Sequence, residues 1–167
     1  MTYLLDDFAD SEVSRFGTAW RFMCDQVMGG QSQGSLELTI SDSKPCLHLH
    51  GQVAAEIGFI QAALSLVHSR YLFDARHFSG VWLTCRSEQS EGFWLHLRSK
   101  ELSMPWQHYA AAFEPVAQWR QLKIPFAEFL PQATGHELNL ERLTSIGIAC
   151  ARRQFYPDLF VSEIGFY

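Results

Sequence analysis

The segment Asp25-Gln-Val-Met-Gly-Gly-Gln-Ser-Gln-Gly34 is the most informative stretch of the chain, and it directly follows the apolar and aromatic segment Trp20–Cys24. Glycine is favoured where the backbone needs a positive φ or must approach another group closely. A strand followed by a glycine-rich run is typical of a tight loop whose path is set by its backbone. We therefore predict a structural loop in which polar side chains hydrogen-bond to loop backbone. Its main residues are Asp25, Gly29, Gly30, Ser32 and Gly34.

Outside this loop, apolar and polar residues alternate with a period of two, which is the pattern of strands with one buried face. Helical periodicity is scarce, and polar turns separate the alternating segments. Many strands joined by such turns indicate an all-β fold, and we predict a single jelly-roll-like β-sandwich domain over residues 1–167. The predicted strands cover residues 35–40, 46–53, 59–67, 81–86, 93–98, 107–113, 120–124, 145–150 and 159–166. Short helical turns are predicted at 126–130 and 140–143, and loops at 87–92, 100–107 and 131–139.

The Asp-x-Val-Met-Gly-Gly-x-Ser-x-Gly pattern at 25–34 resembles the opening motif of the complex I intermediate-associated protein family. Further segments resemble the family in the same order along almost the whole chain. They are Leu5-Asp-Asp-Phe8, Gly58-Phe59, Phe78-Ser-Gly80, Leu95-His-Leu-Arg98, Tyr109-Ala-Ala-Ala-Phe113, Trp119 with Ile124-Pro-Phe126, Ile146-Gly-Ile148 and Phe160-Val-Ser-Glu-Ile164. The chain departs from the family pattern where Ile57 replaces a glycine and Ala63 stands near the place of a frequent arginine.

The resemblance implies a β-sandwich of the galactose-binding-domain type. It also implies a non-enzymatic assembly or chaperone-like factor that acts through protein–protein contacts. The implied partner is a subunit or an assembly intermediate of a respiratory complex, with complex I as the partner of the founding members.

Composition and charge indicate which partners and which cellular compartment to expect. The net charge is −5 and no basic cluster is present, so we do not expect a nucleic-acid partner. No apolar run is long enough for a membrane span. The N-terminus lacks the basic region of a secretory signal and the arginines of a transit peptide, which predicts a cytoplasmic protein. Four widely spaced cysteines fit buried, reduced thiols, consistent with that compartment.

A group of aromatic and basic side chains is the candidate binding site. If the strands at 81–86 and 93–98 pair through the 87–92 hairpin, their non-core side chains share one concave surface. Indole, imidazole and guanidinium groups together suit recognition of a partner, or alternatively of a carbohydrate or small ligand. The competing interpretation is that the tryptophans pack under loops and the arginines form ordinary surface pairs. The candidate residues are Trp82, Arg86, Trp94, His96, Arg98, His108 and Tyr109.

No cofactor, resident metal or catalytic residue is predicted. His48-x-His50 has a spacing able to chelate a transition metal, but no third ligand is readable, and we interpret the pair as incidental. Asp6, Asp7 and Glu163 could together suit calcium, but we prefer the interpretation that Asp7 bonds backbone amides in a turn. The chain has no nucleophile elbow, zinc-protease helix or nucleotide-binding fingerprint. An enzyme that uses His96 or His108 with a glutamate is the minority hypothesis.

Overall fold

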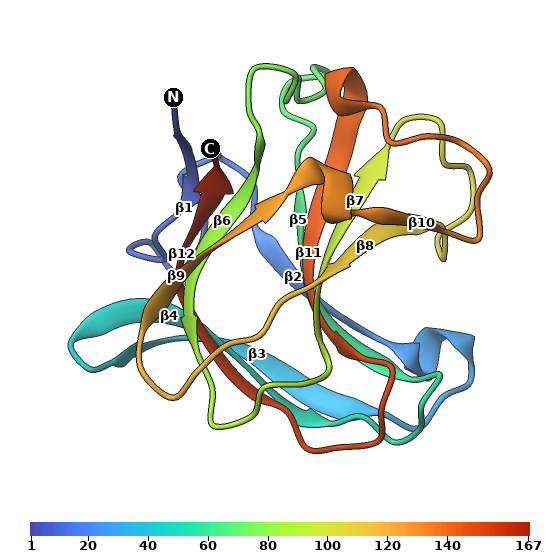
Figure 1. The fold of residues 1–167 in the computed structure, drawn as a ribbon. Coiled ribbons are helices and arrows are strands. Elements are labelled where there is room, and N and C mark those ends of the chain that lie inside the picture. The colour runs from blue at the N-terminus through green and yellow to red at the C-terminus, as the bar shows by residue number, and fades with distance from the viewer.

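Twelve strands form two six-stranded antiparallel sheets in the computed structural model, which describes residues 1–167 (Figure 1). Sheet A has the order β3-β4-β12-β6-β9, and β1 also pairs with β12. Its strands are β1 (Tyr3–Asp6), β3 (Gln33–Ser41), β4 (Lys44–Gln52), β6 (Gly80–Arg86), β9 (Arg120–Pro125) and β12 (Asp158–Phe166).

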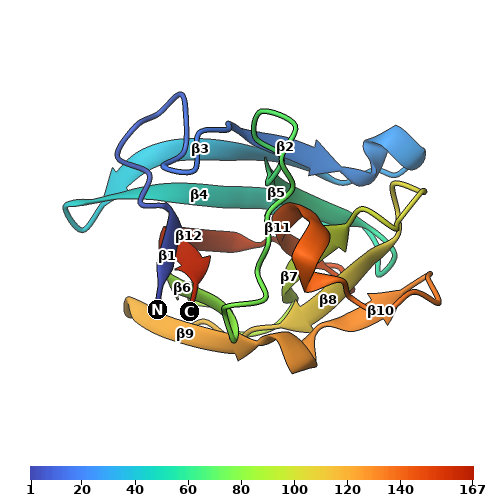
Figure 2. The same cartoon turned by 90° about the horizontal axis from the view of Figure 1, so that it is seen from above.

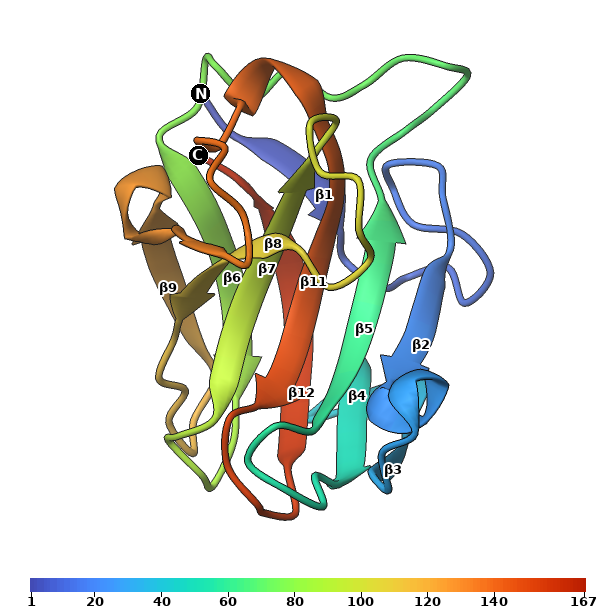
Figure 3. The same ribbon diagram turned by 90° about the vertical axis from the view of Figure 1, so that its right-hand side faces the viewer.

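Sheet B has the order β10-β8-β7-β11-β5-β2, and it is the sheet turned towards the viewer in Figure 3. Its strands are β2 (Trp20–Cys24), β5 (Phe59–Ser65), β7 (Phe93–Ser99), β8 (His108–Ala112), β10 (Leu130–Gln132) and β11 (Leu143–Ala151). The helical elements are short 3-10 turns, namely η1 (Asp25–Met28), η2 (Phe126–Glu128) and η3 (Leu140–Arg142). None of them has the length and hydropathy that a membrane-crossing helix requires.

The core lies between the two sheets, which Figure 2 shows as opposed layers. The central strands contribute alternate side chains to it, as Leu95 and Leu97 of β7 and Leu83 of β6 illustrate. The first and last strands pair, so the two termini lie side by side (Figure 2). The architecture is a jelly-roll-like β-sandwich, which confirms the fold class predicted from the alternation.

The predicted pairing of the strands at 81–86 and 93–98 is wrong. β6 belongs to sheet A, where its neighbours are β12 and β9, whereas β7 belongs to sheet B between β8 and β11. The intervening loop crosses from one sheet to the other at the end of the sandwich. Ser87 fixes this crossing because its amide bonds the carbonyl of Val116 at 2.9 Å and its hydroxyl donates to the carbonyl of Asp158 at 2.7 Å. Alternation identifies which side chains face the core, but it does not identify the sheet.

β1 and β2 are not among the nine predicted strands. Two further short elements were also not predicted. β10 spans the end of the predicted helical turn at 126–130 and the start of the predicted loop at 131–139, and it forms the edge of sheet B beside β8. Its central residue is Pro131, which has no amide hydrogen to donate and is therefore confined to edge positions. The other element is η1, a single 3-10 turn at the start of the glycine-rich loop.

Candidate functional site

The glycine-rich loop is organised around the buried carboxylate of Asp25. Its Oδ1 accepts the amide of Ser32 at 3.0 Å, and its Oδ2 accepts the Ser32 hydroxyl at 2.5 Å and the amide of Phe59 at 3.0 Å. A Cβ at Gly30 or at Gly58 would lie 2.3 Å from a carboxylate oxygen of Asp25. Glycine is therefore required on both sides of the carboxylate, which joins the loop to the start of β5.

Two apolar side chains of this rigid loop point into solvent. Val27 is 81% exposed and Met28 is 59% exposed. They lie on η1 between Gln26 and Ser32, which are joined by a hydrogen bond from the Gln26 amide to the Ser32 carbonyl. Ile57, 93% exposed, lies two residues before the Phe59 amide that bonds Asp25. We refer to Val27, Met28 and Ile57 as the loop tip.

The seven candidate binding residues do not share one surface. Trp94, His96 and Arg98 of β7 and His108 of β8 lie on the outer face of sheet B, because their neighbours along each strand fill the core. Two further candidates, Trp82 and Arg86 of β6, lie on the outer face of sheet A. The last candidate, Tyr109, lies in the core with its hydroxyl donating to the carbonyl of His136 at 2.8 Å.

The two candidates on sheet A are held by their own strand neighbours. Trp82 is buried against Gly165 of β12, its register partner. The Arg86 guanidinium lies 4.2 Å from the Phe160 ring centroid and 5.4 Å from that of Trp119, and it also contacts Asp42 at 3.4 Å. For Arg86 the structure thus favours the alternative interpretation of the sequence, in which the arginines form ordinary surface pairs and bind no ligand.

The remaining candidates form a compact cluster on sheet B, around β11 in the middle of the sheet. Small residues of β11 form its floor, since Gly147 is opposite His96 and Ala149 is opposite Trp94. Gln61 of β5 lies across Gly147, and its Oε1 accepts a hydrogen bond from His96 Nδ1 at 2.8 Å. We call the cluster the sheet-B face; it consists of Gln61, Trp94, His96, His108 and Arg152.

His96 is electrically neutral at pH 7. Burial, together with the charges of His108 and Arg152, holds the pKa of His96 well below its usual range. Because Nδ1 donates to Gln61, Nε2 is left as an acceptor, and this buried atom has no hydrogen-bond partner. The indole Nε1 of Trp94 is a buried donor that is also unpartnered. The sheet-B face therefore contains one unused acceptor and one unused donor, and both atoms are buried.

Trp94 and Arg98, on the outer face of sheet B, are less available to a ligand than the sequence suggested. The guanidinium of Arg152 lies 3.8 Å from the ring centroid of Trp94, so it occupies one side of the indole. Arg98 uses Nη1 to donate to the carbonyls of Met104, Pro105 and Gln107, and it thereby closes the β7–β8 loop. Arg98 is a loop-positioning residue.

Sequence reasoning missed three residues around this face. Gln61 falls on the outward phase of its predicted strand, but only the β5–β11–β7 order brings it to His96. Arg152 lies in the turn after β11 with a φ of 66°, outside every predicted strand. Trp106 is 53% exposed on the β7–β8 loop, next to His108, whose Nδ1 donates to the Trp106 carbonyl at 2.9 Å.

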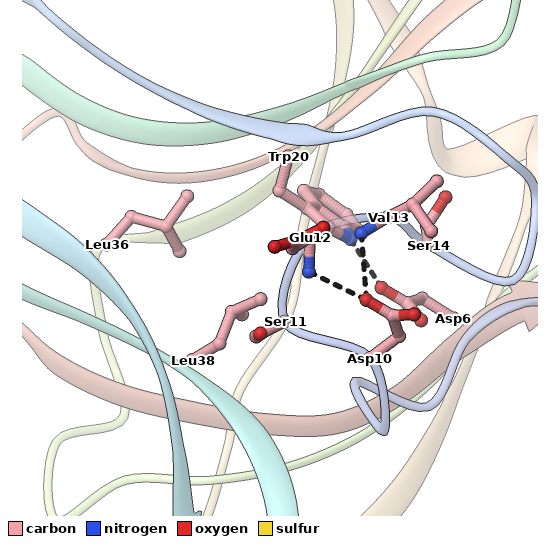
Figure 4. A pocket seen from close by; sticks show the side chains of 9 residues that line it. All are labelled: Asp6, Asp10, Ser11, Glu12, Val13, Ser14, Trp20, Leu36 and Leu38. Carbon is pink, nitrogen blue, oxygen red and sulfur yellow. Dashed lines mark hydrogen bonds between the residues drawn. The ribbon is translucent and has the colours of Figure 1, made fainter.

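A cavity of about 330 Å³ lies beneath the β1–β2 loop, between Trp20 and the side chains of β3 (Figure 4). Its carboxylates are used internally, as Asp6 accepts Trp20 Nε1 at 2.8 Å and Asp10 accepts the amides of Glu12 and Val13. Burial raises the pKa of Asp6. Asp6 and Asp10, two of the three carboxylates that line this cavity, thus hold the β1–β2 loop in place.

The three carboxylates weighed as calcium ligands, Asp6, Asp7 and Glu163, have separate local roles. Asp7 accepts the Ala9 amide at 3.2 Å, as interpreted from the sequence, and pairs with Arg15 at 3.0 Å. Glu163 lies on β12 in register with Thr84.

The fold and these sites together define a class of protein. Two packed antiparallel sheets in this order make the chain a jelly-roll-like β-sandwich domain. Within this class, the chain belongs to the family described as complex I intermediate-associated protein 30, whose family model matches residues 7–158. The family resemblance seen in the sequence is thereby confirmed.

Solved structures support the same fold. The chain resembles the family 11 carbohydrate-binding module of the cellulosomal cellulase Lic26A-Cel5E of Clostridium thermocellum, with a TM-score of 0.76 and 15% identity over 99% of this chain and 94% of that one. It also resembles the family 30 carbohydrate-binding module of cellulase Cel9D-Cel44B of Clostridium thermocellum, with a TM-score of 0.62 and 13% identity over 99% and 97% of the two chains. A region comprising 25% of an exo-beta-agarase is similar with a TM-score of 0.64, 12% identity and 99% of this chain covered. No curated protein matches the chain by sequence.

Proposed function

We propose that the chain is a non-enzymatic binding module that works as an assembly or chaperone-like factor for a respiratory complex, complex I foremost, through protein–protein contacts. Membership of the complex I intermediate-associated protein 30 family supports the class of partner. The observation that carries the mode of action is the loop tip, where Val27 and Met28 are exposed on a backbone locked by Asp25.

Preorganisation of the loop and the residue types at its tip both favour binding to a protein partner. Binding by a flexible loop loses conformational entropy, whereas a loop that is already ordered avoids most of that cost. Methionine and aromatic residues are enriched at protein interfaces. Met28 fits such an anchor, and Val27 beside it adds exposed apolar surface that a partner could bury.

The test is affinity purification of the full chain from its native host, followed by native gel analysis of respiratory-complex intermediates. The test variant is Val27→Ser/Met28→Ser, and the control is Ile40→Ser, which removes an apolar residue that is 71% exposed on sheet A. We expect complex I subunits or intermediates with the wild type and the control but not with the test variant. Retention of the same subunits by the test variant would disprove the loop-tip surface, and their absence from the wild type would disprove the assembly role.

A carbohydrate or small polar ligand on the sheet-B face is the second candidate function. It is favoured by the unpartnered Trp94 Nε1 and His96 Nε2, since a buried unsatisfied polar group costs about 1–3 kcal/mol that a ligand could recover. It is disfavoured by the Arg152 guanidinium, which covers one side of the Trp94 ring where a sugar would stack. Titration with soluble β-glucans should therefore give no heat, and measurable binding that is lost in His96→Ala would reverse the order of the two candidates.

Two further aspects of the proposal follow from local contacts. A histidine–glutamate catalytic pair has no support near His96 or His108, because their partners are the Gln61 amide and the Trp106 carbonyl.

All four cysteines are unpaired, which supports a reducing compartment, and we propose the cytoplasm. Cell fractionation followed by immunodetection of the full-length product tests that location.

A further inference from the structure

A cluster of metal-ligating side chains lies on the outer face of sheet A, remote in topology from the sheet-B face. His48 and His50 are two positions apart on β4, so both project outward from the sheet. Glu37 of β3 is the register partner of His48, and Asp158 of β12 is the register partner of His50. The third ligand that the sequence did not reveal is thus supplied by the neighbouring strand.

The distances among these side chains fit a small divalent ion. Glu37 Oε2 is 3.8 Å from His48 Nδ1 and 3.5 Å from His50 Nε2, and the ligand atoms of the three residues lie within 4.8 Å of one another. Zinc bonds of about 2.1 Å in a tetrahedron separate adjacent ligand atoms by about 3.4 Å. Small side-chain rotations would bring the three ligand atoms to that spacing.

His48 is already oriented for this role by two neighbours. Its Nε2 is hydrogen-bonded to Asp158 Oδ1, and its ring stacks on Phe160 with a centroid separation of 4.1 Å and an interplanar angle of 8°. A carboxylate that holds one imidazole nitrogen fixes the tautomer and leaves the other nitrogen as a ligand, as in the carboxylate–histidine–zinc arrangement. Here the free nitrogen is Nδ1, which faces Glu37.

Local contacts also limit the site. The His50 ring stacks on His48 at 4.2 Å, and its Nε2 lies 3.0 Å from the Ser35 hydroxyl, which a metal would displace. Glu37 is exposed, so its side chain must be ordered by the metal. These features favour a solvent-accessible site of moderate affinity rather than a closed structural one.

We propose that Glu37, His48 and His50 bind one late first-row divalent cation of the Zn²⁺ class, that water completes the coordination, and that Asp158 is the positioning residue for His48. Imidazole ligands select zinc, copper and nickel over calcium and magnesium, which prefer oxygen-only sites. The Irving–Williams order predicts tighter binding of Cu²⁺ than of Zn²⁺. This site is independent of the proposed function and connects the edge strand β3 to β4.

The experiment is isothermal titration of the untagged, chelator-treated full chain with Zn²⁺, and Cu²⁺ electron paramagnetic resonance to count ligating nitrogens. The variants are His50→Ala and Glu37→Gln, with His136→Ala as the control because His136 lies in an exposed loop outside the cluster. We expect one equivalent of Zn²⁺, at least a tenfold loss of affinity in both variants, no change in the control, and two nitrogens coupled to Cu²⁺ that become one in His50→Ala. Circular dichroism confirms that each variant is folded.

Other results would overturn the proposal. Absence of stoichiometric Zn²⁺ binding, or equal affinity in His50→Ala and His136→Ala, excludes a site built from these residues. Asp158→Asn should weaken Zn²⁺ about 10- to 100-fold while the two coupled nitrogens remain. An unchanged affinity in Asp158→Asn would refute the positioning role.

Discussion

At the scale of single residues, the buried carboxylate of Asp25 is the centre of the hydrogen-bond network that holds the glycine-rich loop. Three donors converge on it, namely the amide and hydroxyl of Ser32 and the amide of Phe59. The same Ser32 hydroxyl accepts the amide of Ala54 at 3.0 Å, so the network extends to the next loop. In this chain, the motif at 25–34 thus buries one carboxylate with these three donors satisfied.

Replacing Asp25 with alanine should destabilise the fold. Three buried donors lose their acceptor, and each unsatisfied donor costs about 1–3 kcal/mol, so we expect a loss of roughly 3 kcal/mol or more in the free energy of unfolding. Urea denaturation of Asp25→Ala and the wild type measures this loss in the free energy of unfolding. Asp10→Ala is the control, because Asp10 accepts two amides in an exposed turn and should cost less. Equal losses in the two variants would contradict the proposed network.

His96 should make stability depend on pH. Its pKa is lowered in the folded state, so below about pH 6.5 the unfolded chain binds more protons and the free energy of unfolding falls as pH falls. The stability that neutral His96 contributes is complete above its unfolded pKa. The slope from this group approaches about 1.4 kcal/mol per pH unit between the folded and unfolded pKa values.

Comparison of variants isolates this effect. Urea denaturation of His96→Gln between pH 5 and pH 7.5 should show a shallower dependence than the wild type, while His136→Gln, altered in an exposed loop, should match the wild type. Parallel pH profiles of His96→Gln and the wild type would show that His96 does not titrate differently on folding.

At the scale of elements, alternation placed the strands well, and the nine predicted strands correspond to β3 to β9, β11 and β12. Alternation could not assign strands to sheets. Both β6 and β7 bury every second residue, and either pattern fits either sheet equally well. The sheet choice depends on the crossover at Ser87, whose bonds are to Val116 and Asp158, residues distant along the chain.

Ser87→Ala tests the crossover. The variant leaves the buried Ser87 position without its hydroxyl bond to the Asp158 carbonyl, and we expect a loss of about 1 kcal/mol in the free energy of unfolding. Chemical denaturation provides the measurement, with Ser90→Ala in the exposed part of the same loop as the control. A neutral Ser87→Ala would mean that the crossover is held by the backbone alone.

At the scale of the whole molecule, the sandwich separates its chemistry onto two opposed outer faces. Sheet A carries the Glu37, His48 and His50 cluster, whereas sheet B carries Trp94 and His96. The core between them holds the thiols of Cys85 and Cys150, and burial raises the pKa of Cys85 to about 12 and raises that of Cys150 further still. Cys46 is also buried, but on the outward phase of β4.

Thiol labelling should therefore report global unfolding. With an aromatic disulfide reagent at pH 8, only Cys24, which is partly exposed, should react quickly in the native protein, and the other three should react on unfolding. Cys24→Ser should abolish the fast phase. Rapid labelling of any thiol in folded Cys24→Ser would contradict this expectation and would indicate local opening around a buried cysteine.

The sequence by itself determined the fold class and the family, because a period-two pattern and an ordered set of motifs depend on local residue types. It also located the structural loop, since glycines beside an aspartate constrain the backbone wherever the loop lies. The tertiary structure alone decided which side chains meet. Trp82 and Trp94 have the same local pattern but lie on opposite faces, and Glu37 reaches His48 only through the β3–β4 register. The physical reason is that strand pairing is set by contacts between residues far apart in the chain, which local periodicity does not encode.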